Sequence, residues 1–248
     1  MGTALWRSLF LHSPSALCIQ YRMKGKVIGI IALALGVIAA FVCCFGVIAH
    51  TASCDRGGVR VVLDAGHGGI DGGVQGRETK CKESDINLAV VFYLQEELKS
   101  AGVEVTLTRS SEAGLYGTTA KYFKKRDMEK RRQIIERAAP ALVVSVHQNF
   151  FANRSKRGAN VFYKRGDGSG EALASSILNE FRGKEGTPQT RAPLLGDYYM
   201  LNCTAYPSVI VECAFLSNPD DEALLVSEEY RREIARRISR GILSFLMQ

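Results

Sequence analysis

The sequence contains only four histidines, at positions 12, 50, 67 and 147, and its seven cysteines include no CxxC pair. The lack of paired cysteines argues against a zinc finger. The HExxH and HxxE patterns of short-spaced metallohydrolases are absent, as are the GxxxxGK[ST] and GxGxxG loops that bind phosphates. Cysteine spacing does not suggest a disulfide framework either, and a chain of 248 residues is large enough not to need one.

Acidic residues are absent from the first 50 positions, where Arg7, Arg22, Lys24 and Lys26 contribute a charge of +4. The rest of the chain holds 28 of the 32 basic residues and all 25 acidic ones, which leaves +3 of the total +7. Nucleic-acid binding usually requires a concentrated basic face. The sequence therefore predicts no nucleic-acid partner.

Charge is also missing from residues 27–49, a run of 23 mostly apolar residues. A helix of that length spans roughly 34 Å, enough to cross a bilayer core of about 30 Å. Basic residues precede it at positions 22, 24 and 26, which places the N-terminus in the cytoplasm by the positive-inside rule. A cleaved signal peptide is the alternative, although its apolar region is normally about 7–15 residues long.

These features divide the chain into a cytoplasmic tail over residues 1–26, a single transmembrane anchor over 27–49, a linker over 50–58 and a catalytic domain over 59–248. The domain is expected on the extracytoplasmic side of the membrane. Synthesis could also start at Met23, which opens the stretch MKGKVIGII.

Strand and helix patterns alternate beyond residue 58. Short apolar or β-branched runs predict strands over 59–64, 103–108, 141–147, 159–163 and 208–213. Helical periodicity predicts helices over 84–101, 126–138, 170–182 and about 227–247, the first with Ser84 as its N-cap and Gly102 after its end. This alternation predicts an α/β fold with a mainly parallel or mixed central sheet and helices on both faces.

Three of the predicted strands lead into residues that can carry chemistry: His67, His147 and Glu212. Glu83 directly precedes the first long helix. Functional groups of an open α/β sheet collect beyond the C-terminal ends of its strands. One histidine at such a place is most often structural, but both histidines of the predicted domain occupy strand ends.

Two imidazoles and one carboxylate make a common catalytic zinc site whose fourth position is open to water. His67, Glu83 and His147 are therefore predicted to bind one Zn²⁺, and Glu212 to act as general base on a zinc-activated water. The glycines beside His67 give the backbone freedom to bend around the metal. Asp64 and Asp71 are candidates to orient the ligands.

The motifs VVLDAGHGGIDGG, KESDINLAV, SVHQN and YPSVIVECAFLSNPDDEALL, in this order over about residues 59–246, resemble the zinc-dependent N-acetylmuramoyl-L-alanine amidases of the Amidase_3 type. The resemblance implies a peptidoglycan hydrolase that cleaves the amide between N-acetylmuramic acid and the L-alanine of the stem peptide. It assigns zinc binding to His67, Glu83 and His147 and catalysis to Glu212.

The span before the domain, the loop TRSSEAGLYGTTAKYFKKRDMEKR and the stretch NCTAYPSVIVECAFLSNP further resemble the germination-specific subgroup of spore-forming bacteria. That resemblance implies a role in spore cortex maturation, in which a partner polysaccharide deacetylase completes muramic δ-lactam. Only 64 residues separate His147 from Glu212, too few for the autoinhibitory helix of some relatives. Control is then expected from expression, localisation or an activator protein.

Several alternatives remain at this point. The chain could be a vegetative cell-wall amidase that acts in wall turnover or cell separation, a wall peptidase on the same fold, or a non-catalytic wall-binding module. Its substrate-binding residues are not specified. Arg109, Arg126 and Arg131 could hold stem-peptide carboxylates, although surface or structural pairing is the commoner role of such residues.

Overall fold

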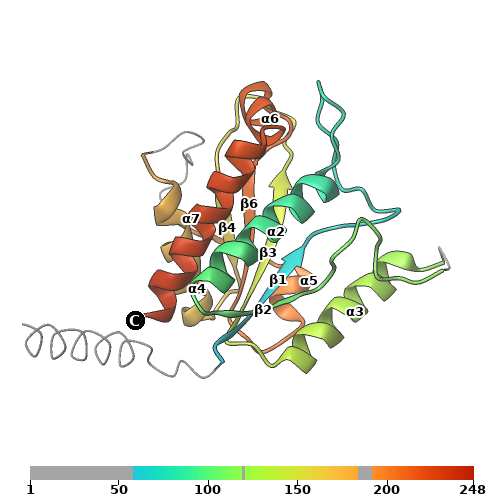
Figure 1. Cartoon of the computed structure of the whole chain (residues 1–248). Helices are drawn as coiled ribbons and strands as arrows, with labels where there is room; N and C mark the ends of the chain where they lie inside the picture. The colour runs from blue at the N-terminus through green and yellow to red at the C-terminus, as the bar shows by residue number, and fades with distance from the viewer. Residues whose placement is uncertain (1–57, 119–120, 184–191) are drawn as a thin grey trace, which may run out of the picture. The chain divides into compact units, whose positions relative to one another are not determined.

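The computed structural model describes residues 58–118, 121–183 and 192–248, which form one α/β unit (Figure 1). Its strands are β1 Arg60–Ala65, β2 Glu104–Leu107, β3 Leu142–Asn149, β4 Asn160–Tyr163, β5 Leu194–Leu195 and β6 Ser208–Phe215. Its helices are α2 Glu83–Ser100, α3 Phe123–Ala138, α4 Gly168–Phe181, α5 Tyr199–Asn202, α6 Pro219–Leu225 and α7 Glu228–Leu246.

The predicted cytoplasmic tail, the predicted transmembrane segment 27–49 and all but the last residue of the predicted linker lie outside the described residues. Among the helices of the described ranges, none combines the length and apolar character needed to cross a membrane.

The six strands form one sheet in the order β2-β1-β3-β6-β4-β5. Strand β1 pairs in parallel with β2 and β3, β3 pairs in parallel with β6, and β4 pairs in parallel with β5. Among these six described strands, β4–β6 is the one antiparallel pair. The predicted mixed, mainly parallel sheet is thus confirmed, and the ends of β1, β3 and β6 meet at one edge, together with the beginning of β4.

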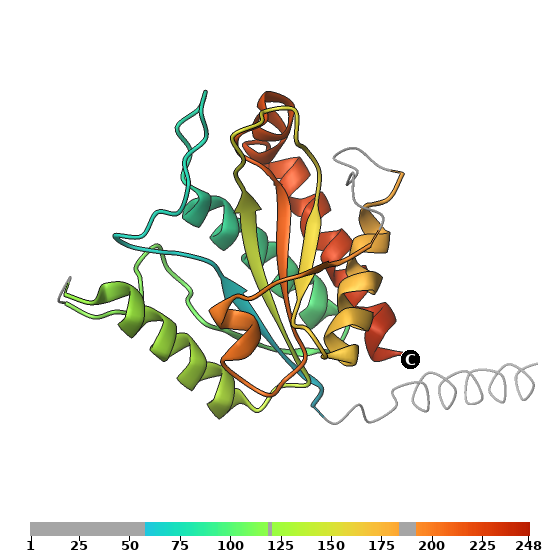
Figure 2. The same ribbon diagram turned by 180° about the vertical axis from the view of Figure 1, so that it is seen from behind.

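Both faces of the sheet are covered by helices, as predicted (Figure 2). Alternate residues of β1 point to opposite faces, as strand geometry requires. Val61, Leu63 and Ala65 join the larger core beneath α2, α4 and α7, whereas Val62 joins a smaller core with residues of α3 and α5. The sheet is therefore buried on both sides, which leaves its edge as the place for polar chemistry.

Helix α2 begins one residue before its predicted start. Its N-cap is Lys82, which makes no side-chain cap bond, so the prediction of Ser84 as the cap is wrong. The amides of Glu83 and Ser84 donate instead to the carbonyls of Val74 and Gly72. Because the loop satisfies these free donors, no side-chain cap is required, and Glu83 is held at the helix start.

Helix α6 was not predicted, although its signal is present in the sequence. The Asn218 side chain accepts hydrogen bonds from the amides of Asp220 and Asp221, and Pro219 occupies the first turn. Both features are typical of a helix start. The helix is only 7 residues long, which makes its apolar period hard to detect.

Candidate metal centre

His67 lies just beyond the end of β1 in a strained backbone conformation. Its φ is +63°, a left-handed value that non-glycine residues seldom adopt. The Arg131 guanidinium holds it there by donating to the carbonyls of His67, at 2.6 Å, and Ala65, at 2.7 Å. Arg109 donates to the carbonyls of Ala65 and Gly66 at 2.9 and 3.0 Å. Two buried arginines thus fix the turn that aims His67 into the site.

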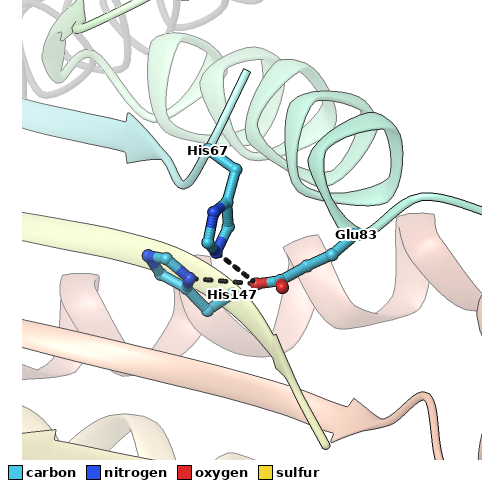
Figure 3. Close-up of side chains that lie close together, drawn as sticks. All are labelled: His67, Glu83 and His147. Atoms are coloured by element: carbon cyan, nitrogen blue, oxygen red, sulfur yellow. Dashed lines mark hydrogen bonds and ion pairs between the residues drawn. The ribbon is translucent and has the colours of Figure 1, made fainter. Parts of the chain in front are cut away.

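Glu83, at the start of α2, and His147, near the end of β3, converge with His67 on one point (Figure 3). Oxygen Oε1 of Glu83 lies 3.2 Å from His67 Nε2 and 3.0 Å from His147 Nδ1. The two imidazole rings are 5.0 Å apart and nearly perpendicular. One potential ligand atom of each residue lies within 4.8 Å of the others.

The carboxylate of Glu83 is held by hydrogen bonds on both oxygens. Oxygen Oε2 accepts from the amide of Val74 at 3.0 Å, and Oε1 accepts from the amide of Gln148 at 3.1 Å and from Asn87 Nδ2 at 3.3 Å. Burial alone would raise the pKa of Glu83, but hydrogen bonds and charge from His147 and His67 outweigh it and lower that pKa strongly. Glu83 is therefore a fixed, ionised carboxylate.

Close packing at the site depends on two glycines. A Cβ on Gly66 would overlap the imidazole ring of His147, and a Cβ on Gly73, whose φ is +67°, would overlap the side chains of His67 and Glu83. The glycines around His67 therefore provide space for the other two side chains as well as backbone freedom.

These residues fit a zinc ion. Two imidazole nitrogens and one carboxylate oxygen are a common donor set of catalytic zinc, and they face one another from three separate elements. Asp71 Oδ1 lies 2.9 Å from the second nitrogen of His67, Nδ1, which is the usual partner arrangement for a metal-binding histidine. The prediction that Asp71 orients a ligand agrees with this contact.

Glu212 lies on β6 directly beside His147 of β3 in the register of the sheet. Both side chains line a cleft of about 470 Å³ together with His67, Glu83 and Tyr198. Burial raises the pKa of Glu212 to about 7, and the nearby charge of Glu83 adds to this rise while the two histidines oppose it. Oxygen Oε2 of Glu212 is buried and has no hydrogen-bond partner within the described ranges. The carboxyl group is thus available to a ligand in the cleft.

Asp64 makes no hydrogen bond or ion pair with the three ligand residues in the described ranges, so any orienting role is indirect. Its carboxylate accepts from Arg131, Thr108 and Ser145 beneath the site. Burial alone would raise the pKa of Asp64, but the charge of Arg131 and these hydrogen bonds lower it to about 2. Arg131 therefore links the Asp64 carboxylate to the carbonyl of His67.

The three arginines considered for substrate binding differ in position. Arg109 and Arg131 are only 3% and 0% exposed and are occupied with backbone carbonyls and Asp64, so both have a structural role. Arg126 is exposed. Cys213, which follows the candidate base Glu212, is buried in the core on the opposite side of the strand.

Sequence reasoning missed the support that Asn87 and Gln148 give to Glu83. The side-chain Nε2 of Gln148 donates to Asn87 Oδ1 at 3.1 Å, and Asn87 Nδ2 in turn donates to Glu83. A signal existed, because Asn87 lies four residues after Glu83, on the same helix face, and Gln148 directly follows His147.

The fold and the site together define a class: an α/β domain with a candidate metal centre of two histidines and one glutamate at the C-terminal edge of its parallel strands. The Amidase_3 family, described as N-acetylmuramoyl-L-alanine amidase, matches residues 61–244. The chain belongs to this family and is an N-acetylmuramoyl-L-alanine amidase, as the sequence motifs indicated.

Similar proteins support the assignment. The germination-specific N-acetylmuramoyl-L-alanine amidase of Bacillus subtilis is 33% identical over 192 residues, which cover 76% of this chain and 80% of that protein. The amidase AmiA of Escherichia coli is 27% identical, with coverages of 76% and 77%. The CwlD amidase of Clostridioides difficile, solved in complex with the GerS lipoprotein, has a TM-score of 0.71 at 33% identity and covers 76% of this chain and 98% of its own.

Proposed function

We propose that this amidase is zinc-dependent, with His67, Glu83 and His147 as the metal ligands and Glu212 as the proton-transfer residue. The proposal rests chiefly on one observation: the convergent ligand trio lies beside a buried carboxyl group that lacks a partner among the described residues. Zinc bound there would supply Lewis-acid activation of the water that attacks the lactyl carbonyl.

Residues of the chain itself position the reacting groups and transfer the proton. Val74 and Gln148 hold the Glu83 carboxylate by their backbone amides, and Arg131 of α3 holds the carbonyl of His67, so little reorganisation is needed at the moment of reaction. Glu212 accepts a proton from the attacking water and returns it to the alanine nitrogen as the amide bond breaks. A pKa near 7 suits a group that must do both near neutral pH.

The test is mass spectrometry of peptidoglycan digested by the full-length chain, with and without a chelator. We expect intact stem peptides that carry a free N-terminal L-alanine, and their loss when metal is removed. Free amino acids or shortened stems would indicate a peptidase instead. Intact peptidoglycan in the presence of sufficient zinc would favour a wall-binding module or a missing partner.

We further propose that spore cortex peptidoglycan is the natural substrate, so that cleavage prepares muramic acid for δ-lactam formation by a polysaccharide deacetylase. The similarity to the germination-specific amidase of Bacillus subtilis supports this role over vegetative wall turnover. Rates of stem release from purified cortex and from vegetative wall would decide between them: faster release from cortex is expected, and equal or slower release would contradict the role.

A protein partner is part of this proposal, because the CwlD amidase of Clostridioides difficile was solved with the GerS lipoprotein. An activator protein would provide the control that the short stretch between His147 and Glu212 gives no room for. Co-purification of the tagged chain from sporulating cells would test this, and recovery of the chain alone would count against it.

Residues 27–49 are proposed to anchor the chain, with the catalytic domain on the extracytoplasmic side. The support is the uncharged run itself and the basic residues that precede it. Carbonate extraction of membranes and protease accessibility in intact cells would test it. Release of the chain into the soluble fraction would contradict the anchor.

A further inference from the structure

A second pocket opens beside the metal cleft. It has a volume of about 390 Å³, and its lining includes Phe151, Lys156 and Phe162. Asn149 and Tyr198 line both this second pocket and the metal cleft. The two hollows therefore adjoin, and a single extended ligand can occupy both.

Aromatic side chains form much of the second pocket. Phe151 is 52% exposed and Tyr198 is 43% exposed, unusually high values for large apolar groups. The rings of Phe162 and Tyr198 meet edge to face with centroids 5.3 Å apart, which holds Tyr198 in place at the boundary. Exposed aromatic surface that lines a concave site is typical of ligand binding.

The lining of the second pocket also includes two basic side chains, one of which has no carboxylate partner in the described residues. Arg157 pairs with Asp220 at 3.0 Å and with Asp221 at 3.5 Å, so neighbouring carboxylates already balance its charge. Lys156 is exposed and has no carboxylate within salt-bridge distance in the described part of the chain. A ligand in the second pocket would therefore meet an unbalanced positive charge.

The loop that carries Lys156 is fixed on both sides. The amide of Gly158 donates to Asp221 at 2.7 Å, and Asn218 Nδ2 donates to the carbonyl of Arg154 at 2.7 Å. Both partners lie at the start of α6. Because the loop is already ordered, binding at Lys156 would lose little free energy to loop ordering.

We propose that the second pocket is a subsite for the acidic part of the stem peptide and that Lys156 binds a peptide carboxylate there. The inference rests on the proposed function, which puts the scissile amide in the metal cleft. One side of that amide is an uncharged acetylated sugar chain, whereas the other is a peptide that carries carboxylates. Charge complementarity with Lys156 selects the peptide, and the aromatic rings pack against its aliphatic parts.

The experiment compares two muramyl peptides that differ only in whether the carboxylates beyond the first alanine are free or amidated. With the zinc-loaded full-length chain, we expect lower KM for the free acid. Lys156→Gln should raise KM for the free acid about five- to tenfold, leave kcat unchanged and abolish the preference. Lys156→Arg should largely restore the preference for the free acid.

Lys99→Gln is the matched control, because Lys99 is an exposed lysine in the last turn of α2, far from this edge of the sheet. Lys99→Gln should leave the KM of both substrates unchanged. An equal rise in KM for both substrates in Lys156→Gln would overturn the subsite and indicate that the sugar chain occupies the pocket. An unchanged KM for both substrates would overturn it too and indicate that no ligand occupies the pocket.

A binding measurement separates this inference from the proposed function. Calorimetry with the free stem peptide as ligand needs no turnover, and it should show about five- to tenfold weaker binding to Lys156→Gln than to the wild type. Peptide binding that depends on Lys156 in a chain without amidase activity would uphold the subsite and reject the mechanism. Amidase activity without peptide binding that depends on Lys156 would uphold the mechanism and reject the subsite.

Discussion

The metal cleft and the second pocket lie side by side at one edge of the sheet but are built differently. In the metal cleft, each ligand residue is held by backbone or buried hydrogen bonds, as with Glu83 between Val74 and Gln148. In the second pocket, Phe151 and Lys156 are exposed. The chemistry therefore depends on positions fixed before any ligand arrives, whereas the adjoining surface is left free for contact.

The largest effect is expected from Glu212, the one carboxyl group of the metal cleft without a partner in the described residues. Glu212→Gln keeps the size of the side chain but removes the base, so turnover should fall on the order of 10²- to 10⁴-fold. Bound zinc, measured by atomic absorption, should remain. His147→Ala is the contrasting variant and should lose zinc as well. Near-normal turnover of Glu212→Gln would remove it from the mechanism.

The second largest effect is expected from substitution of Arg131, since this residue is fully buried and links Asp64 to the carbonyl of His67. Arg131→Met leaves a buried carboxylate without its charge partner and should lower the free energy of unfolding by about 3–5 kcal/mol. Urea denaturation would measure this. Arg132→Met on the same helix removes part-exposed ion pairs with Glu129 and Glu136 and a contact with Tyr199, so its loss should be small. Similar losses in both variants would contradict the structural role of Arg131.

Acid should destabilise the fold by protonating Asp64, the carboxylate that pairs with Arg131. The pKa of Asp64 is about 2 in the folded chain, below its ordinary value of 3.8, so its ionised form stabilises the fold above about pH 4. That stabilisation, about 2–3 kcal/mol from the difference between the two pKa values, should be lost as the pH falls from about 5 toward 2. Unfolding free energies at pH 6 and pH 3 would measure it.

Asp64→Asn provides the control for this pH effect, because it removes the titrating group while other carboxylates still titrate. The variant should be less stable at pH 6 but show a shallower loss on acidification. An unchanged pH dependence would mean that the carboxylate of Asp64 is not the source.

The smallest effect is expected from Gly66→Ala, which tests space rather than charge. The added Cβ would press against the His147 ring and shift this ligand, so zinc affinity should fall about 10- to 100-fold. Competition with a fluorescent chelator would measure the affinity. Gly102→Ala provides a contrast, since nothing lies within 4 Å of its Cβ position, although its φ of +80° adds backbone strain. Equal zinc affinity in Gly66→Ala and the wild type would show that His147 can move without cost.

Sequence patterns predicted the long elements and missed the short ones. Strand 141–147 is apolar nearly throughout and helix 84–101 has an apolar helical period, and both lie within a residue or two of β3 and α2. The helix predicted from residue 126 begins at Phe123, and β5, at 2 residues, carries no period that a pattern could detect. Tertiary contacts decide such ends, because a loop carbonyl can replace a side-chain cap, as Val74 does for α2.

The sequence by itself determined the order of the long strands and helices along the chain, the residue types able to bind zinc and the family to which the chain belongs. Those properties follow from local periodicity and from motifs of a few adjacent residues. Only the tertiary structure decided that Arg131 supports His67 instead of meeting substrate, and that Tyr198 joins two pockets. Such roles depend on distances between residues far apart in the chain, which the packing of the sheet and its helices creates.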